Sequence, residues 1–444
     1  MQAKTKKERS PRLPFGNAGE ITERLLQFIW QFQYFNKSSL TTAAGEELKI
    51  IFPGRFNTNQ GPDFSNAKII VGNTTWAGHV ELHIKTSDWK KHNHNADKNY
   101  NNVVLHVVWQ HDEPVEEKFP ILELKDKVAK VLLQHYSSLM NATGFIACEK
   151  MIAAVSDIAL KSWKERLLAE RLMRKAGVVL EYLSESNFHW EECFWWLLAR
   201  NFGMKVNADA FEAIARTIPV NILAKHKNQI HQLEALLLGQ AGLLQDDFSQ
   251  DYPAMLKKEF LFLQKKYNLL QPAQPVYFLS MRPVNFPTIR LAQLAMLIHH
   301  SAHLFSKIKE ADSVMQVKQW FDVTANDYWH YHYRFDEPSA FKKKNLGKAM
   351  IENIIINTIA PVLFAYGNYH SESRWKQKAL DWLEATAAES NSITNNFAKL
   401  KVENKTAFDS QSLIELKTQY CDKKRCLECG IGNAILKSGM LNVE

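Results

Sequence analysis

Residues 61–86 read GPDFSNAKIIVGNTTWAGHVELHIKT, and this stretch decides the fold of the first third of the chain. Within it, two runs with the composition of strands, 67–71 and 76–86, lie on either side of Gly72-Asn73-Thr74. A short turn containing Gly and Asn between two such runs is typical of a β-hairpin. The sequence therefore predicts two antiparallel strands, with Gly61-Pro62-Asp63-Phe64 at the entry to the first.

Further elements are predicted on both sides of the hairpin. They are a helix that starts at Thr22, strands at 48–52, 103–109 and 121–124, and a helix at 128–136. This order is typical of one sheet flanked by helices. From Ser156, a favourable helix N-cap, apolar residues recur at helical spacing through most of the remaining chain. We therefore expect an α+β protein, with an amino-terminal α/β region containing a small mixed sheet and a mostly α-helical region after it.

The length of 444 residues fits two or three domains. We expect a disordered basic tail at 1–18, an α/β domain at 19–150 and a helical domain at 151–400. Residues 401–444 are predicted to form a linker, a helix and a cysteine-rich tail.

The composition is that of a globular protein, with 46% hydrophobic and 23% charged residues. The apolar run at 354–366 is shorter than the roughly 20 residues that span a bilayer, and the amino-terminus does not resemble a secretion signal. We therefore predict a cytoplasmic protein that does not enter a membrane. The net charge of +8 is compatible with a nucleic-acid partner, because Lys and Arg displace counterions from phosphates.

Several common enzyme classes are disfavoured by motifs that the sequence lacks. It contains no Gly-rich phosphate loop, no Gly-x-Ser-x-Gly nucleophile elbow and no dinucleotide-binding fingerprint. An ordinary NTPase, an α/β-hydrolase and a Rossmann dehydrogenase are therefore poor explanations of this chain.

The densest polar chemistry lies on the second strand of the hairpin. Glu81, His83 and Lys85 alternate with apolar residues, so all three share one face of the strand. Three ionisable groups in a row must point at solvent, at one another or at an ion. Asp63, at the entry to the preceding strand, can bring a second carboxylate to Glu81.

Two carboxylates close together are suited to a hard divalent cation, so Asp63 and Glu81 predict a site for Mg²⁺ or Mn²⁺. His83 or Lys85 is then placed to orient or deprotonate an attacking water. The predicted catalytic residues are Asp63, Glu81, His83 and Lys85.

This arrangement resembles the PD-(D/E)xK nuclease superfamily, in which an Asp on one strand and a Glu-x-Lys on the next hold the metal. Pro62-Asp63 matches the first element, and Glu81 matches the acidic position of the second. The sequence departs from the pattern at the lysine, because His83 stands where Lys is expected and Lys85 comes two residues later. The resemblance implies cleavage of nucleic acid, with His83 and Lys85 as equal candidates for the role of the lysine.

An alternative is a transition-metal site built from histidines, since imidazole favours Zn, Fe or Ni. His83, His92, His94 and His106 all lie between residues 83 and 106. His106 is on a strand with otherwise apolar residues, so it is either a metal ligand or a buried, hydrogen-bonded histidine. His92 and His94 lie in a polar loop and are expected at the surface.

A second resemblance extends over most of the chain. The segments that carry it are 61–64, 78–83, 88–89, 100–108, 282–287 and 420–432. In this order they are similar to an uncharacterised bacterial family known as a domain of unknown function. The resemblance implies a bacterial origin and a shared fold, and it brings no established activity.

Three of the five cysteines form the spacing Cys421-x₄-Cys426-x₂-Cys429. Thiols at such spacing are typical of soft-metal ligands, and Cys148 is the predicted fourth. Cys193 lies among aromatic residues at helical spacing and is expected in the core. The alternatives left open are an iron–sulfur cluster, a zinc ion and four unligated thiols, with a structural role for either metal. The spacing resembles one found in [2Fe–2S] proteins.

Three functions remain in competition. The first is a metal-dependent nuclease that uses Asp63, Glu81, His83 and Lys85. The second is a catalytically inactive nucleic-acid-binding or scaffold protein on the same fold. The third is a different enzyme that holds a transition metal through its histidines.

Overall fold

A computed structural model of the protein describes residues 21–114, 119–279, 281–301 and 303–438. The chain divides into two units. Unit 1 contains the residues up to Trp163 and those from Leu416 onward, and unit 2 is Lys164–Glu415. The domain boundaries predicted from the sequence were at residues 150 and 400. The basic tail predicted at 1–18 lies outside the described residues.

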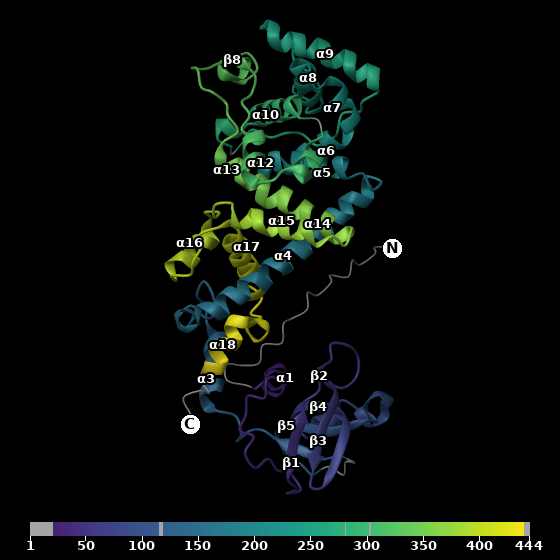
Figure 1. Cartoon of the computed structure of the whole chain (residues 1–444), viewed down its shortest axis with the longest axis vertical. Coiled ribbons are helices and arrows are strands. Elements are labelled where there is room, and N and C mark those ends of the chain that lie inside the picture. The colour runs from purple at the N-terminus through teal and green to yellow at the C-terminus, as the bar shows by residue number, and fades with distance from the viewer. Residues whose placement is uncertain (1–20, 115–118, 280, 302, 439–444) are drawn as a thin grey trace, which may run out of the picture. The chain divides into compact units, whose positions relative to one another are not determined.

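Unit 1 is built on a single mixed sheet whose strands are ordered β1-β3-β4-β5-β6, with β2 paired to β3 (Figure 1). Its strands are β1 (Leu48–Phe52), β2 (Arg55–Phe56), β3 (Phe64–Val71), β4 (Thr74–Lys85), β5 (Val103–Gln110) and β6 (Ile121–Glu123). Pairs from β1 to β4 are antiparallel, whereas β4, β5 and β6 run parallel to one another. The small mixed sheet predicted in this region is confirmed.

The hairpin between β3 and β4 forms where the sequence predicted it. Val71 pairs with Thr74, which leaves Gly72 and Asn73 as the turn. Gly72 has a φ of 55°, a left-handed conformation that glycine adopts without steric cost. The turn fixes the register of β4, and the register decides which face of the sheet receives Glu81 and His83.

Helices and short helical turns complete unit 1. They are α1 (Glu23–Gln31), α2 (Asp88–Lys91), η1 (His94–Ala96), η2 (Lys98–Tyr100), α3 (Lys130–Asn141), η3 (Ile152–Ala154), η7 (Leu416–Cys421), η8 (Cys426–Glu428) and α18 (Gly430–Ser438). Thr22 caps α1 as predicted, because its side chain accepts the backbone N–H of Leu25. Helix α1 packs against β4 and buries Leu25, Leu26 and Ile29 completely.

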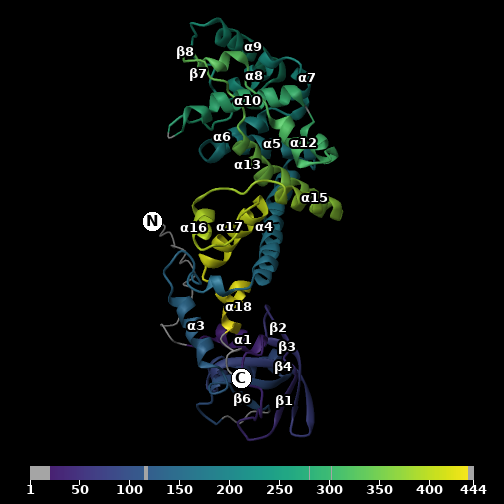
Figure 2. The same ribbon diagram turned by 60° about the vertical axis from the view of Figure 1, so that its left-hand side comes forward.

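Unit 2 is almost entirely helical, which confirms the predicted second region. Helix α4 (Asp157–Glu185) enters it at Lys164. Its other elements are α5 (Trp190–Phe202), α6 (Met204–Thr217), α7 (Val220–His226), α8 (Ile230–Gln240), α9 (Asp251–Tyr267), η4 (Pro283–Asn285), α10 (Pro287–His300), α11 (Leu304–Glu310), α12 (Val314–Phe321), η5 (Asp327–His330), β7 (His332–Arg334), β8 (Glu337–Pro338), α13 (Lys348–Ile354), η6 (Ile355–Ile359), α14 (Ala360–Tyr369), α15 (Ser373–Glu384), α16 (Ser392–Lys399) and α17 (Ala407–Glu415). Both views place α8 between α9 and α10 (Figures 1 and 2).

One helical stretch, Lys348–Tyr369, is long and apolar enough to cross a membrane, with a mean hydropathy of 1.5. Most of it is buried inside unit 2, so it serves as a core helix there. The stretch is not regular, because α13 passes through a π-helical segment, η6, before it continues as α14. Pro361 comes just after η6 within this continuous helical stretch, and it has no N–H to donate to the preceding turn.

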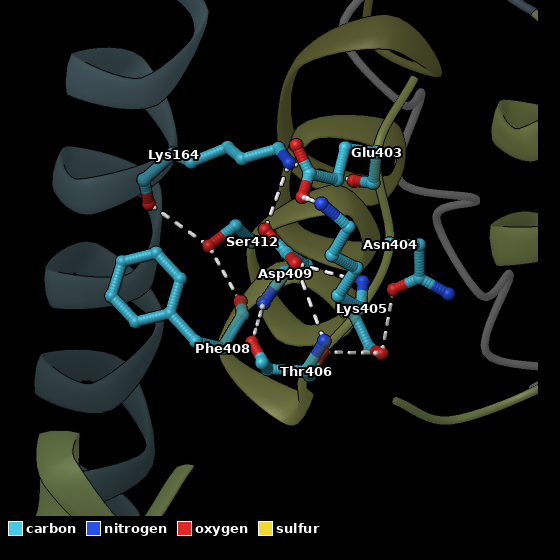
Figure 3. A network of polar contacts seen from close by, with 9 residues as sticks. Lys164, Glu403, Asn404, Lys405, Thr406, Phe408, Asp409 and Ser412 are labelled. Atoms are coloured by element: carbon cyan, nitrogen blue, oxygen red, sulfur yellow. Dashed lines mark hydrogen bonds and ion pairs between the residues drawn. The ribbon is translucent and has the colours of Figure 1, made fainter. Parts of the chain in front are cut away.

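A polar network fastens the segment before α17 to helix α4 (Figure 3). The ammonium group of Lys164 donates to the backbone carbonyl of Glu403 and to a carboxylate oxygen of Asp409 at 2.7 and 2.8 Å. The hydroxyl of Ser412 donates to the carbonyl of Lys164 at 2.9 Å. Because Lys164 is 6% exposed, removing Asp409 would leave a buried charge without its acidic partner, which is costly.

Glu234 in α8 generates a prediction about pH. It is completely buried, and it accepts hydrogen bonds from the hydroxyl of Tyr252 and the indole N–H of Trp329. Burial raises the pKa of Glu234 from 4.5 to about 7, so the folded chain keeps this proton to a higher pH than the unfolded chain. Stability should therefore fall as pH rises from about 4.5 to about 7, by up to ~3 kcal/mol from this group.

The measurement is urea unfolding at several pH values for the natural protein and for Glu234→Gln. The free energy of unfolding of Glu234→Gln should lack this component of the decrease. An identical pH dependence in both proteins would show that Glu234 does not titrate in this window.

Candidate metal centre

The polar row on β4 divides into a buried part and an exposed part. Glu81 and His83 are 6% and 1% exposed. Lys85 is exposed at the end of the strand, where its backbone N–H donates to Asp88. Within the described residues, no ion pair links the ammonium group of Lys85 to Asp63 or Glu81. The row predicted from the sequence is therefore brought together only in part.

Asp63 and Glu81 are locked to each other through the backbone. The backbone N–H of Asp63 donates to Glu81 Oε2 at 2.9 Å. The carboxylate of Asp63 accepts the backbone N–H of Leu82 at 3.1 Å and the side-chain amide of Gln27 in α1 at 2.8 Å. The two carboxylates predicted to meet across the hairpin thus lie beside each other, held by neighbouring strands and a helix.

The protons of these carboxyl groups are held tightly. Burial raises the pKa of Asp63, and the backbone N–H of Leu82 opposes part of that increase. Burial also raises the pKa of Glu81, and the neighbouring charge of Asp63 raises it further. Two carboxylates in a site of low dielectric repel each other, so a bound cation would favour the ionised form of both.

Three histidines converge beside this carboxylate pair. Nε2 of His83 lies 3.0 Å from Nδ1 of His92 and 3.3 Å from Nε2 of His94. All three nitrogens lie within 4.8 Å of one another. His83 is buried on β4, whereas His94 is half-buried and His92 is exposed, so one side of the cluster opens to solvent.

Glu81 completes the cluster with an oxygen. Its Oε1 lies 3.7 Å from Nε2 of His83 and 3.6 Å from Nε2 of His94. In a tetrahedral site with metal–nitrogen bonds of about 2.1 Å, the ligand atoms are about 3.4 Å apart. The three imidazoles are therefore placed to hold one metal ion, and Glu81 lies beside two of them as a candidate further ligand.

The loop after β4 brings His92 and His94 to this point. His92 is exposed, as expected of a surface residue, while His94 is half-buried, and both lie beside His83. They follow the short helix α2, and Asn93 between them adopts a left-handed conformation with a φ of 59°. This residue reverses the chain direction, so the rings on both sides of it face His83. Asn tolerates this conformation better than most residues. These residues belong to the histidine-rich alternative that the sequence left open.

His106 supports the cluster from β5, where it pairs in parallel register with Glu81. Its Nε2 lies 2.9 Å from Nδ1 of His83. If Nδ1 of His83 carries the proton and donates it to His106, Nε2 of His83 is left as a free lone pair for a metal. His106 is a buried, hydrogen-bonded histidine, which is one of the two alternatives that the sequence left open, and it is placed to orient His83.

Both buried histidines are neutral at any ordinary pH. Burial, followed by the neighbouring histidines, lowers the pKa of His83 to about 2 and that of His106 to about 3. Neutral imidazole is the form that binds metals. A neutral ring offers one N–H donor and one acceptor nitrogen, so without a metal Nδ1 of His83 can donate to His106 while Nε2 accepts an N–H from His92 or His94.

Aromatic side chains wall the cluster. The ring of Tyr100 stacks on His94 with centroids 3.9 Å apart. Trp89 is almost fully buried against His94 and His106, and its indole N–H donates to Asn95 at 2.7 Å. These contacts hold the rings of the loop in place and limit their freedom to turn away.

The four predicted cysteine ligands also come together, at a separate place in unit 1. Cys148, Cys421, Cys426 and Cys429 line one small cavity of about 20 Å³. All four thiols are free of disulfide bonds. Burial raises the pKa of Cys148 to about 12 and that of Cys426 to about 11, and nearby thiols raise both further. Cys193 is fully buried in α5, as expected of a core residue.

Residues 23–392 match a family described as protein of unknown function (DUF2851). The chain belongs to this family. None of the curated proteins and none of the solved structures compared with the chain matches it. The uncharacterised family predicted from the sequence is confirmed, whereas the resemblance to PD-(D/E)xK nucleases stays a prediction. The DUF2851 match includes the carboxylates and the histidines, and it ends before Cys421.

Metal analysis of the whole protein tests the site. His83→Ala and His94→Ala should each lose one equivalent of a first-row transition metal that the natural protein retains, because each removes a ligand. His111→Ala is the matched control, since His111 follows β5 and its ring contacts only Thr86 among the hydrogen bonds of the described chain. Equal metal content in all four proteins would contradict the assignment.

Proposed function

We propose that unit 1 is a metal-dependent hydrolase that cleaves phosphodiester bonds in nucleic acid. The observation that carries the proposal is the convergence of the imidazoles of His83, His92 and His94, with Glu81 beside two of them and Asp63 next to Glu81. Bound there, a divalent metal supplies a Lewis acid and a water of lowered pKa.

The ligand set favours a transition metal over Mg²⁺. Imidazole suits Zn²⁺ and Fe²⁺, and carboxylate suits Mn²⁺ and Mg²⁺. With three nitrogens and one oxygen, Zn²⁺, Fe²⁺ or Mn²⁺ fits better than Mg²⁺, which prefers oxygen ligands. Of the two metals predicted from the sequence, Mn²⁺ is therefore the one we retain.

The surrounding residues have separate roles in this proposal. The substrate enters at the exposed side of the cluster, where His92 lies. At the opposite side, the buried ring of His83 keeps water out. Asp63 lies beside Glu81 and can take a proton from an attacking water. Nucleic acid is favoured as the substrate by the net charge of +8 and by the resemblance of Pro62-Asp63 and Glu81 to a nuclease motif.

A catalytically inactive nucleic-acid-binding or scaffold protein is the second candidate. It is favoured by the position of Lys85, which is exposed and separate from the carboxylates. In a nuclease that depends on this lysine, the side chain would lie beside the carboxylates, and here it does not. In the first candidate, His83 and the other imidazoles bind a metal that makes the lysine unnecessary. In the second candidate, catalysis is lost.

A nuclease assay with Mn²⁺ on single- and double-stranded DNA and RNA separates the candidates. Asp63→Asn and Glu81→Gln should lower the cleavage rate about 100-fold or more, because they remove a proton acceptor and a metal ligand. Lys85→Ala should retain most of the activity, since its side chain lies outside the cluster.

Circular dichroism and unfolding midpoints of the variants serve as the control for folding. Salt-dependent binding without cleavage by the natural protein would support the scaffold candidate instead. A loss of activity in Lys85→Ala equal to that in Glu81→Gln would show that the lysine has a catalytic role.

We also propose that the four cysteines hold an iron–sulfur cluster with a structural role. The four cysteines line one buried cavity, so their thiols are available to a shared metal group. The spacing Cys421-x₄-Cys426-x₂-Cys429 resembles one found in [2Fe–2S] proteins, which favours a cluster over a single zinc ion.

The surroundings of Cys429 support this proposal. Its sulfur accepts the backbone N–H groups of Ile431 and Gly432 at the start of α18, and such hydrogen bonds tune iron–sulfur clusters. Gly432 has no room for a side chain, since an added Cβ would lie 2.1 Å from the carbonyl of Cys426. The cluster would join the carboxy-terminal segment to the region around Cys148.

Protein purified without oxygen tests the assignment through iron, acid-labile sulfide and visible absorbance. Cys148→Ser and Cys426→Ser should lose all three signals. Cys193→Ser and His83→Ala should retain the absorbance, since neither residue lines the cavity. Zinc without sulfide in the natural protein would contradict an iron–sulfur cluster.

A further inference from the structure

Unit 2 contains a polar cavity of about 660 Å³ between α5, α6, α10 and the α13–η6 stretch. This volume is within the range of sites that bind small molecules and cofactors. Its polar lining includes Arg200, Lys205, Arg290, Asn201, Asn353 and Asn357. None of the described residues that line it carries a carboxylate. Arg200 is paired with Asp209 and Glu212 outside this lining, whereas Arg290 and Lys205 form no ion pair within the described residues.

Arg290 is the central feature of this cavity. It is 7% exposed, and its guanidinium donates to Asn285 Oδ1 at 2.6 Å and to Gln293 Oε1 at 3.0 Å. Both partners are neutral amides. Its Nε has no hydrogen-bond partner within the described chain, and no carboxylate there pairs with it. Burial lowers the pKa of Arg290 only to about 10, so the side chain is charged at neutral pH.

A buried charge without a partner destabilises a fold by several kcal/mol. Lys164 and Arg171 of unit 2 have acidic partners in Asp409 and Glu415, and the buried Lys344 donates to two backbone carbonyls. Arg290 has only neutral side-chain partners, and it lines a cavity. Residues that weaken the fold in this way are commonly kept for a ligand.

The backbone of the cavity wall is also unusual. Asn357 and Thr358 line the cavity from η6, the π-helical segment Ile355–Ile359. Short π-helical segments inside α-helices occur frequently at functional sites. Across the cavity, Asn201 donates to Thr358 at 3.0 Å, while its own Oδ1 has no partner within the described chain. A free acceptor and a free cationic donor thus line the same space.

We propose that this cavity binds a small organic phosphate of about the size of a mononucleotide, with the phosphate on Arg290. The planar guanidinium presents a fork of N–H donors that matches phosphate oxygens. Lys205 adds a second positive charge, and within the described residues it makes no ion pair. The inference does not depend on the proposed function of unit 1.

The rest of the lining suits the organic part of such a ligand. Leu197, Met204 and Met350 supply apolar surface, and methionine adapts its shape to flat or irregular partners. The amides of Asn353 and Asn357 can donate and accept hydrogen bonds with hydroxyl or ring nitrogen groups. A sugar or a base would therefore find complementary contacts beside the phosphate.

Titration calorimetry and thermal unfolding of the whole protein test the proposal. The probes are a panel of nucleoside 5′-monophosphates, the matching nucleosides and inorganic phosphate. At least one monophosphate should bind and raise the unfolding midpoint, and its nucleoside should bind at least tenfold more weakly. Arg290→Met should abolish the ligand-induced shift and leave the ligand-free midpoint unchanged or higher, because it removes an unpaired buried charge.

Two variants serve as controls. Arg374→Met changes an arginine that is exposed and lies outside the cavity, so it should bind as the natural protein does. His83→Ala should also retain the shift, which separates this cavity from the metal centre. A shift that survives in Arg290→Met, a lower ligand-free midpoint in that variant, or binding of inorganic phosphate with no gain from the organic part would overturn the proposal.

Discussion

The burial of Glu81 and His83 side by side on β4 is the constraint on which the metal centre depends. Ionisable groups in a sheet of low dielectric are costly unless they are paired or bound to an ion. The hairpin register directs both side chains to one face, and the parallel pairing of β4 with β5 brings His106 behind them. The loop with Asn93 then covers the same face with two further imidazoles. Each of these features is intelligible as a way to hold one cation.

Much of the fold of unit 1 could be predicted from local sequence signals. Alternating apolar residues around Gly72 and Asn73 predict the hairpin, and Thr22 predicts the start of α1. The parallel pairing of β4 with β5 could not be predicted, because an alternating pattern gives the faces of a strand and not its neighbours. It could not be predicted either that the segment from Leu416 onward belongs to unit 1, since this depends on contacts between residues more than 250 positions apart.

In the candidate sites too, local geometry could be predicted from the sequence, whereas contacts that depend on loops and packing could not. Asp63, Glu81 and His83 lie on one hairpin, so strand geometry was sufficient to place them together. Strand geometry also placed Lys85 with them, but the strand ends there and its side chain is exposed. His92 and His94 were named as candidates, but their approach to His83 could not be predicted, because the path of a loop depends on a single left-handed residue and on packing against Trp89. Three cysteines were singled out by their spacing, and the structure brings them together with Cys148 around one cavity.

The central claim is that three imidazoles and Glu81 share one metal ion, and a crystal structure of metal-loaded protein with anomalous scattering tests it most directly. The account predicts an anomalous peak about 2.0–2.2 Å from Nε2 of His83, Nδ1 of His92, Nε2 of His94 and Oε1 of Glu81. It also predicts that Nδ1 of His83 remains within hydrogen-bond distance of His106. The absence of a peak at this point, with the rings turned into hydrogen bonds with one another or with water, would contradict the account.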